Sequence, residues 1–133
     1  MRRIFGIETE YGITCATPGG RPPLDAEQAA RRLFMPVVNR HRSSNVFLAN
    51  GGRLYLDVGS HPEYATAECD YLADLLAQDV AGQEIFSDLV TTTNQQLPAD
   101  GINGQIHLLK NNRDSQGNSC GCHENYLLHR SAD

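Results

Sequence analysis

The sequence has neither a basic stripe nor a long apolar run. Its 16 Asp and Glu residues outnumber 11 Lys and Arg, and the resulting formal net charge of −5 argues against a protein that binds nucleic acid through phosphate contacts. Every apolar run is far shorter than the roughly 20 residues that span a bilayer. The first residues lead into a predicted strand rather than the apolar core of a signal peptide. We therefore expect a cytoplasmic protein with no nucleic-acid or membrane partner.

Cysteine is scarce, and the spacing of its four residues is poor for zinc. Cys120 and Cys122 form a C-x-C pair without a second close pair, whereas structural zinc sites usually combine two pairs of ligands. Because His123 follows directly, a zinc site stays open as an alternative to reduced cytosolic thiols beside a glycine turn.

The 133 residues suffice for one domain with its own core. Residues 3–16 alternate like one long strand. Asp25 and Gln28 have capping-box spacing, which predicts a helix over residues 26–38 whose last turn is limited or bent by Pro36. These signals place a strand and a helix in the first third of the chain.

The next segment predicts a hairpin. Asn50-Gly51 separates residues 46–49 from 53–58, and this dipeptide between apolar runs is typical of a tight turn joining antiparallel strands. Residues 63–69 follow as a short extended segment.

The second half predicts one long helix and two strands. Asp70 is positioned to cap a helix over residues 71–96, which Pro98 closes. Residues 105–110 and 123–129 are expected to pair with each other. The apolar residues of the helix recur at helical spacing, which indicates packing on a sheet: Leu72, Leu75, Leu76, Val80, Ile85, Leu89 and Val90. The whole predicts an α+β domain, an antiparallel sheet with helices on one face and the other face free.

Polar residues gather on one face of two predicted strands. Period-2 alternation places Glu8 and Glu10 together on one strand, and Arg53, Tyr55 and Asp57 together on another. The opposite face of that second strand is apolar: Leu54, Leu56 and Val58. Paired carboxylates suit Mg²⁺, and an arginine grips phosphate oxygens. The alternative is a solvated face with surface ion pairs.

Three further residues extend this pattern. Asp57 is the most informative, because Asp is depleted in strand interiors and here ends an apolar-backed strand. Glu63 follows Pro62 and could close a metal site with Glu8. His123 could reach phosphate or metal, with a strand-edge histidine as the alternative.

The residues that carry these features resemble those of a known family. The Pup–protein ligase (proteasome accessory factor A) family is related to glutamine synthetase and glutamate–cysteine ligase, and the similarity covers nearly the whole chain, through GIETEYGIT, SSNVFLANGGRLYLDVGSHPEYATAECD and NNRDSQGNSCGCHENYL. It implies that residues 1–133 are the N-terminal part of a glutamine synthetase-like catalytic domain, with the rest of that domain and a C-terminal domain absent.

The resemblance also implies an activity. Members use ATP and Mg²⁺ to activate the side-chain carboxylate of the C-terminal glutamate of Pup, a ubiquitin-like protein, as an acyl phosphate. A lysine of a target protein then attacks, and the isopeptide product marks the target for proteasomal degradation. Carried over by position, the resemblance makes Asp57 the proton acceptor and Arg53 and Thr66 ATP contacts. It assigns the metal to Glu8, Tyr55 and Glu63, with Glu10 and His123 as weaker candidates.

Two alternatives accompany this expectation. The depupylase/deamidase of the same fold opens more like GTEVEY and carries a long insertion before the NGxRLY hairpin, for which this chain has no room. The other alternative is a catalytically inactive fragment, since family members run to several hundred residues. Cys120 also stands where the family pattern has an aromatic residue.

Overall fold

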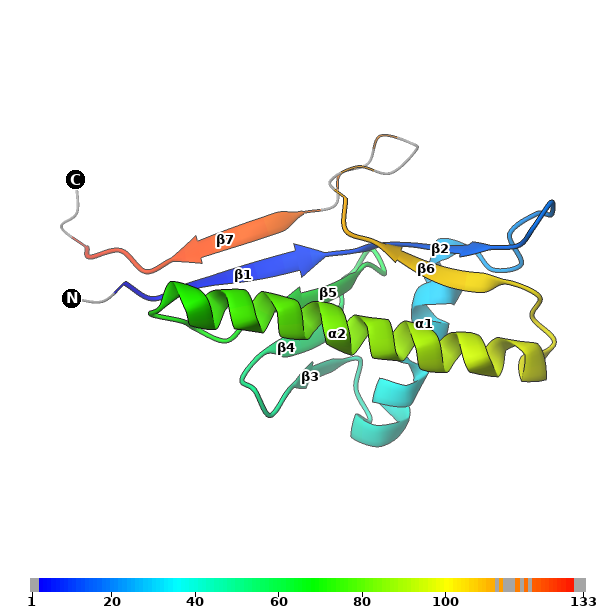
Figure 1. Cartoon of the computed structure of the whole chain (residues 1–133), viewed down its shortest axis with the longest axis horizontal. Helices are drawn as coiled ribbons and strands as arrows, with labels where there is room; N and C mark the ends of the chain where they lie inside the picture. Colours follow the sequence, from blue (N-terminus) through cyan, green and yellow to red (C-terminus); the bar gives the residue numbers. More distant parts are fainter. Residues whose placement is uncertain (1–2, 112, 114–116, 118, 120, 131–133) are drawn as a thin grey trace.

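The computed structural model describes residues 3–111, 113, 117, 119 and 121–130. It contains a five-stranded antiparallel sheet, ordered β3-β4-β5-β1-β7, and a separate two-stranded sheet, β2-β6 (Figure 1). The strands of the large sheet are β1 (Phe5–Glu10), β3 (Asn45–Phe47), β4 (Arg53–Leu56), β5 (Pro62–Ala65) and β7 (Cys122–Tyr126). The small sheet consists of β2 (Gly12–Ala16) and β6 (Gln105–Leu109).

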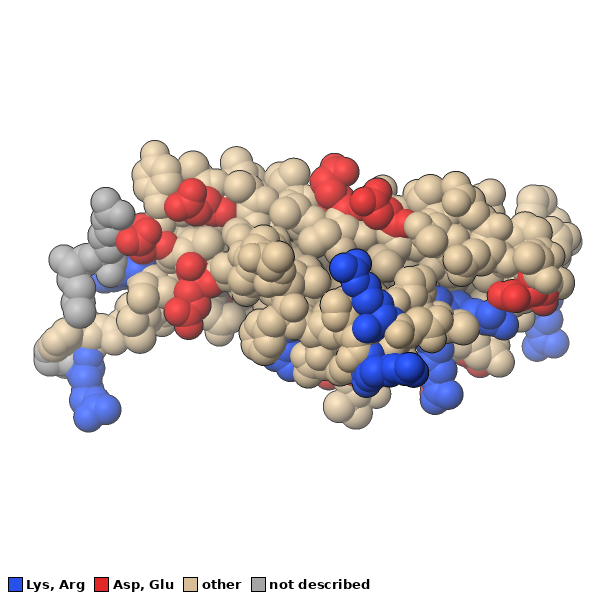
Figure 2. Space-filling view, turned by 90° about the horizontal axis from the view of Figure 1, so that it is seen from below, with Lys and Arg blue, Asp and Glu red and all other residues tan. Residues whose placement is uncertain are grey.

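Two helices and a short 3₁₀ turn complete the fold: α1 (Ala26–His41), α2 (Leu72–Gln96) and η1 (Leu97–Asp100). The expected α+β class is confirmed. Neither α1 nor α2 combines the length and the apolar character that crossing a membrane requires. On the face seen in Figure 2, most lysines and arginines lie toward the lower edge of the molecule, whereas acidic residues lie mainly toward the upper edge and at the left.

The long N-terminal strand predicted over residues 3–16 is wrong in one respect, because it is broken at Tyr11. β1 belongs to the large sheet and β2 pairs with β6 in the small one. At the break, the Tyr11 backbone N–H donates to the Pro62 carbonyl at 2.9 Å, and the ring packs 4.8 Å from that of Phe86, centroid to centroid. Alternation continues through the break, so periodicity alone does not reveal it.

Helix α1 confirms the predicted capping box and extends further than expected. The Asp25 side chain accepts from the Gln28 N–H at 2.8 Å, and the Gln28 side chain accepts from the Asp25 N–H at 3.0 Å. The helix passes Pro36 and ends at His41, before Arg42 in the left-handed conformation. The helix therefore ends at His41 rather than near residue 38, and Pro36 does not limit its last turn there.

Helix α2 corrects two expectations. Its N-cap position is Tyr71, not Asp70. Leu75 is buried and Ile85, Leu89 and Val90 pack against the core, but three of the predicted packing residues are exposed: Leu72, Leu76 and Val80. Spaced four apart, these three form a second apolar stripe on the outer side of the helix, which periodicity does not separate from the inner one.

The predicted hairpin is confirmed, and the predicted last pair is not. β3 and β4 pair with Val46 opposite Leu54, and Gly51 adopts the positive φ of 82° that the turn requires. The segments at 105–110 and 123–129, in contrast, pair with β2 and β1 rather than with each other. At β6, the Asn94 side chain bonds both the N–H and the carbonyl of Ile106, at 2.8 and 3.0 Å.

Tyr64 of β5 joins the sheet to α2 and to the β3–β4 turn. It is 2% exposed; its hydroxyl accepts from the Asn50 amide at 2.9 Å and donates to the Gln78 side chain at 3.0 Å. A Cβ built at Gly82 of α2 would lie 2.3 Å from the ring, and one at Gly52 would lie 2.4 Å from the hydroxyl oxygen. Two glycines therefore make room for this side chain.

We expect Gly82→Ala to lower the free energy of unfolding by about 1–3 kcal/mol, because the added methyl overlaps the Tyr64 ring. The helix propensity of alanine acts in the opposite direction by about 1 kcal/mol. Urea denaturation followed by circular dichroism measures the difference. Ser87→Ala, at an exposed position of α2, is the matched control and should be neutral or slightly stabilising. A stabilised Gly82→Ala variant would show that α2 does not press on Tyr64.

Candidate functional site

The polar residues predicted from the sequence lie on the sheet face opposite the helices. Directly paired residues of antiparallel strands point to the same side of a sheet. The pairings give one row of Phe47, Arg53, Ala65, Glu8 and His123, and a neighbouring row of Asn45, Tyr55, Glu63 and Glu10. The row between them points to the helices and is buried: Val46, Leu54, Tyr64 and Thr9. We call the first two rows the polar face.

Three carboxylates of this face converge. One oxygen each from Glu10, Asp57 and Glu63 lie within 4.8 Å of one another. β1 supplies Glu10, β5 supplies Glu63, and Asp57 follows β4 in a turn whose Asp57 carbonyl accepts from the Ser60 N–H at 2.8 Å. We name these three residues the carboxylate cluster. Its hard oxygen donors are those that Mg²⁺ prefers.

Glu8 and Tyr55, predicted as metal residues with Glu63, are hydrogen-bonded to each other. The Tyr55 hydroxyl donates to one Glu8 oxygen, and the second Glu8 oxygen lies 3.3 Å from Nδ1 of His123. Glu8 therefore stands beside the carboxylate cluster with a partner on each side. The assignment of Glu8, Tyr55 and Glu63 to a metal stays a prediction.

Glu10 is oriented by two contacts from loops. Its carboxylate accepts from the Gly121 backbone N–H at 2.7 Å, and the same oxygen lies 3.8 Å from Nδ1 of His61. Since β7 begins directly after Gly121, this contact links the outer strand to the carboxylate cluster.

Glu63 carries the clearest electrostatic signature of the face. It is 3% exposed, and burial together with the negative charges of Glu10, Asp57 and Glu8 raises its pKa from 4.5 to about 7, while His123 acts in the opposite direction. A carboxylate whose pKa is shifted by burial and by specific charged neighbours marks a candidate functional site.

The two predicted ATP contacts lie beside the carboxylates. Arg53 donates from Nε to the Asn45 side-chain oxygen at 2.8 Å, and its guanidinium carbon lies 4.3 Å from the centroid of the Tyr55 ring. The Thr66 hydroxyl accepts from the Ile7 N–H at 3.0 Å. Thr66 therefore ties the end of β5 to β1, and its role as an ATP contact stays a prediction.

Two residues of the site were not predicted from the sequence. Asn45 accepts a hydrogen bond from Arg53, and His61 lies near the Glu10 carboxylate. The hairpin register offers a signal for Asn45, because a tight turn at Asn50-Gly51 places it across from Tyr55. The possible zinc site stays unsupported: in the described part of the chain, neither Cys122 nor His123 joins a cluster of three metal-ligand side chains. Cys120 lies outside the described residues.

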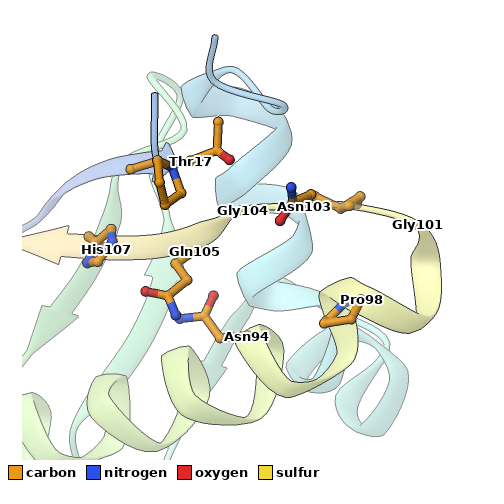
Figure 3. A pocket seen from close by; sticks show the side chains of 11 residues that line it. Thr17, Asn94, Pro98, Gly101, Asn103, Gly104, Gln105 and His107 are labelled. Carbon is orange, nitrogen blue, oxygen red and sulfur yellow. The ribbon is translucent and has the colours of Figure 1, made fainter. Parts of the chain in front are cut away.

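A cavity of about 840 Å³ lies elsewhere (Figure 3). It is open, it lies between the β2–β6 end of the small sheet and the end of α2, and it shares no residue with the polar face. Its polar lining consists of uncharged amides, a histidine and a threonine: Asn94, Asn103, Gln105, His107 and Thr17. It lacks the charged groups that catalysis on a nucleotide needs, so we place the functional site on the polar face.

Comparison with known proteins decides the family. A family model described as Pup-ligase protein matches residues 3–133. This chain belongs to the Pup-ligase family. The Pup–protein ligase of Sanguibacter keddieii is 61% identical over 132 residues, which is 99% of this chain and 29% of that protein. The Pup–protein ligase of Micrococcus luteus is 59% identical over 99% of this chain and 28% of its own length.

Solved structures of the Pup-ligase family agree with the fold. The complex between Pup and its ligase PafA matches with a TM-score of 0.93 and 52% identity, over 99% of this chain and 26% of that one. PafA in complex with ADP matches with a TM-score of 0.64 and 49% identity, over 89% and 25% of the two chains. The predicted family is thus confirmed, and the chain spans less than a third of the length of these relatives.

The raised pKa of Glu63 predicts a pH-dependent stability. The folded state binds the proton of the Glu63 carboxyl more tightly than the unfolded chain does. Protonation of Glu63 therefore stabilises the fold fully below pH 4.5, and this stabilisation is lost as the pH rises through about 7. With EDTA present to remove metal ions, we therefore expect the free energy of unfolding of Glu63→Gln to rise relative to that of the unmodified chain as the pH increases from 4.5 to about 7. The gain should be about 1–3 kcal/mol above pH 7.

Urea denaturation at several pH values measures this difference. Glu84→Gln, the same chemical change on the exposed side of α2, is the control. A stability difference for Glu63→Gln that stays constant from pH 4.5 to 8 would refute the raised pKa.

Proposed function

We propose that the full-length protein containing this chain is an ATP-dependent ligase that joins Pup to lysines of target proteins. The observation that carries this proposal is the 0.93 TM-score over 99% of the chain to a ligase solved with Pup, together with the polar face in the matching segment. The relatives named Pup–protein ligase, about 60% identical, favour the ligase over the depupylase of the same fold. The isopeptide product would mark targets for proteasomal degradation.

ATP and Mg²⁺ are the proposed cosubstrate and cofactor. A related ligase was solved with ADP, and Arg53 offers a guanidinium held by Asn45 and Tyr55 on the same face as the carboxylates. Glu10 and Glu63 of the carboxylate cluster, together with Glu8, fit a divalent cation, because their oxygens are hard donors and because burial and the neighbouring carboxylates oppose ionisation of Glu63. When bound there, Mg²⁺ would neutralise charge on the phosphates.

Asp57 is the proposed proton acceptor in the second half-reaction. A lysine ammonium is not a nucleophile, so a base must take its proton as the amine attacks the acyl phosphate of the Pup glutamate, the C–N bond forms and phosphate leaves. Asp57 is exposed while Glu63 is buried, so Asp57 is the carboxylate of the cluster that an incoming lysine reaches. The turn that the Ser60 N–H closes at Asp57 fixes its position at the end of β4.

The proposed location is the cytoplasm, in keeping with free thiols at Cys15, Cys69 and Cys122. The proposal concerns the full-length protein. We propose that the 133 residues alone are inactive, because they span less than a third of the length of the Pup–protein ligases that they match.

We expect Asp57→Asn in the full-length protein to reduce Pup conjugation about 10²–10⁴-fold, the usual contribution of a general base, while ATP binding stays nearly intact. The amide keeps the shape of the carboxylate but does not accept a proton. Gel analysis of a mixture of Pup ending in glutamate, ATP, Mg²⁺ and a lysine-bearing target measures conjugation. If the wild-type protein forms no conjugate, the proposed function fails; if Asp57→Asn ligates at the normal rate, only the role of Asp57 fails.

Glu8→Gln and Glu63→Gln should each raise the Mg²⁺ concentration at which ATP turnover is half-maximal, since a Mg²⁺ site with few protein ligands weakens when it loses a charged oxygen. A magnesium titration at fixed ATP measures the midpoint, with Glu84→Gln on α2 as the matched control. Unchanged midpoints for both variants would identify Glu8 and Glu63 as carboxylates that do not bind the metal.

A further inference from the structure

Phe47 is an exposed aromatic residue at one end of the polar face. It lies on β3, the outer strand of the large sheet, directly opposite Arg53. Its side chain is 78% exposed, whereas its neighbour Val46 is turned into the core. Phe34 and Phe86, in contrast, are almost fully buried in the hydrophobic core, to which Phe47 does not belong. An apolar ring in this position is accessible to a ligand.

Arg53 lies between Phe47 and the carboxylates. Its guanidinium carbon is 5.9 Å from the centroid of the Phe47 ring and 4.3 Å from that of Tyr55. Its Nε is bonded to Asn45, and within the described part of the chain its Nη atoms make no hydrogen bond and no ion pair with the acidic side chains nearby. The guanidinium is thus positioned by two rings and an amide, and its Nη donors stay available for phosphate oxygens.

The order of these groups across the sheet matches the parts of a nucleotide. Strands are spaced by about 4.8 Å, so β3 lies about 10 Å from β5, which carries Glu63, with Arg53 on β4 between them. The acidic, cation-accepting end is on β5 and β1, the phosphate-binding group is in the middle, and the uncharged ring is at the outer end. An extended nucleoside triphosphate has the same sequence of metal-bound phosphates, inner phosphates and base.

We propose that Phe47 is a binding residue for the base of the nucleotide, which stacks on its ring while Arg53 holds the phosphate chain. This inference rests on the proposed function, since it deepens the ATP site described above. A purine fits the exposed ring because its flat π-face stacks on an aromatic side chain without a charged partner. The remainder of the full-length protein is the competing occupant of this ring, and the test distinguishes the two.

The experiment compares ATP with inorganic tripolyphosphate, which has the phosphates and lacks the base. In the full-length protein, Phe47→Ala should weaken ATP binding, measured by calorimetry, about 5- to 100-fold, the range for loss of one base–aromatic stack. Competition by tripolyphosphate should change less than about twofold, because no base is lost. Phe47→Trp, which restores an aromatic face, should bind ATP like the wild type. Leu76→Ala, which removes another exposed apolar side chain, on α2, is the matched control.

Two results would overturn the inference. One is ATP binding by Phe47→Ala that equals that of the wild type. The other is an equal loss of ATP and tripolyphosphate binding, which would indicate that the ring packs against the rest of the protein. Calorimetry does not depend on ligation, so a wild-type protein that binds ATP but forms no Pup conjugate would count against the proposed function alone.

Discussion

The packing of Tyr64 against α2 is the contact on which the rest of the structure depends. Its ring fills the space left by Gly82, and its hydroxyl connects Asn50 of the hairpin turn with Gln78 of α2. One side chain therefore fixes the distance of the helix from the sheet and the position of the β3–β4 turn. Because Glu63 and Ala65 flank it on the same strand, the same contact fixes how the middle of the polar face is presented.

The division of the sheet into an apolar and a polar side explains how a site rich in charge coexists with a stable core. Helices α1 and α2 cover the apolar side, and the repulsion among the carboxylates is confined to the other side, which the two helices leave uncovered. Residues outside the strands complete the polar face. Asp57 and Gly121 reach the polar face from turns, which place a carboxylate and a backbone donor where strand geometry alone would not.

Local signals in the sequence predicted the local structure well. The capping box at Asp25 and the hairpin at Asn50-Gly51 were confirmed, since each depends on residues a few positions apart, and alternation placed Glu8 and Arg53 on the correct face. The predicted pairing of residues 105–110 with 123–129 was wrong, because pairing between strands far apart in the sequence leaves no local pattern. The same limit applied to the site: Glu10 comes near Asp57 and Glu63 only through the register of three strands, and Asn45 joins the polar face only through the register of the hairpin.

The alternation of β5 has a consequence for how this segment tolerates change. Glu63, Tyr64 and Ala65 alternate between the two sides of the sheet within three residues, so a shift of one position would bury a carboxylate beneath α2 and expose the tyrosine that anchors the helix. Substitutions on the polar face leave this arrangement in place, whereas a single inserted or deleted residue reverses it. The length of the chain between β4 and β5 is therefore under stricter constraint than the identity of most residues along it.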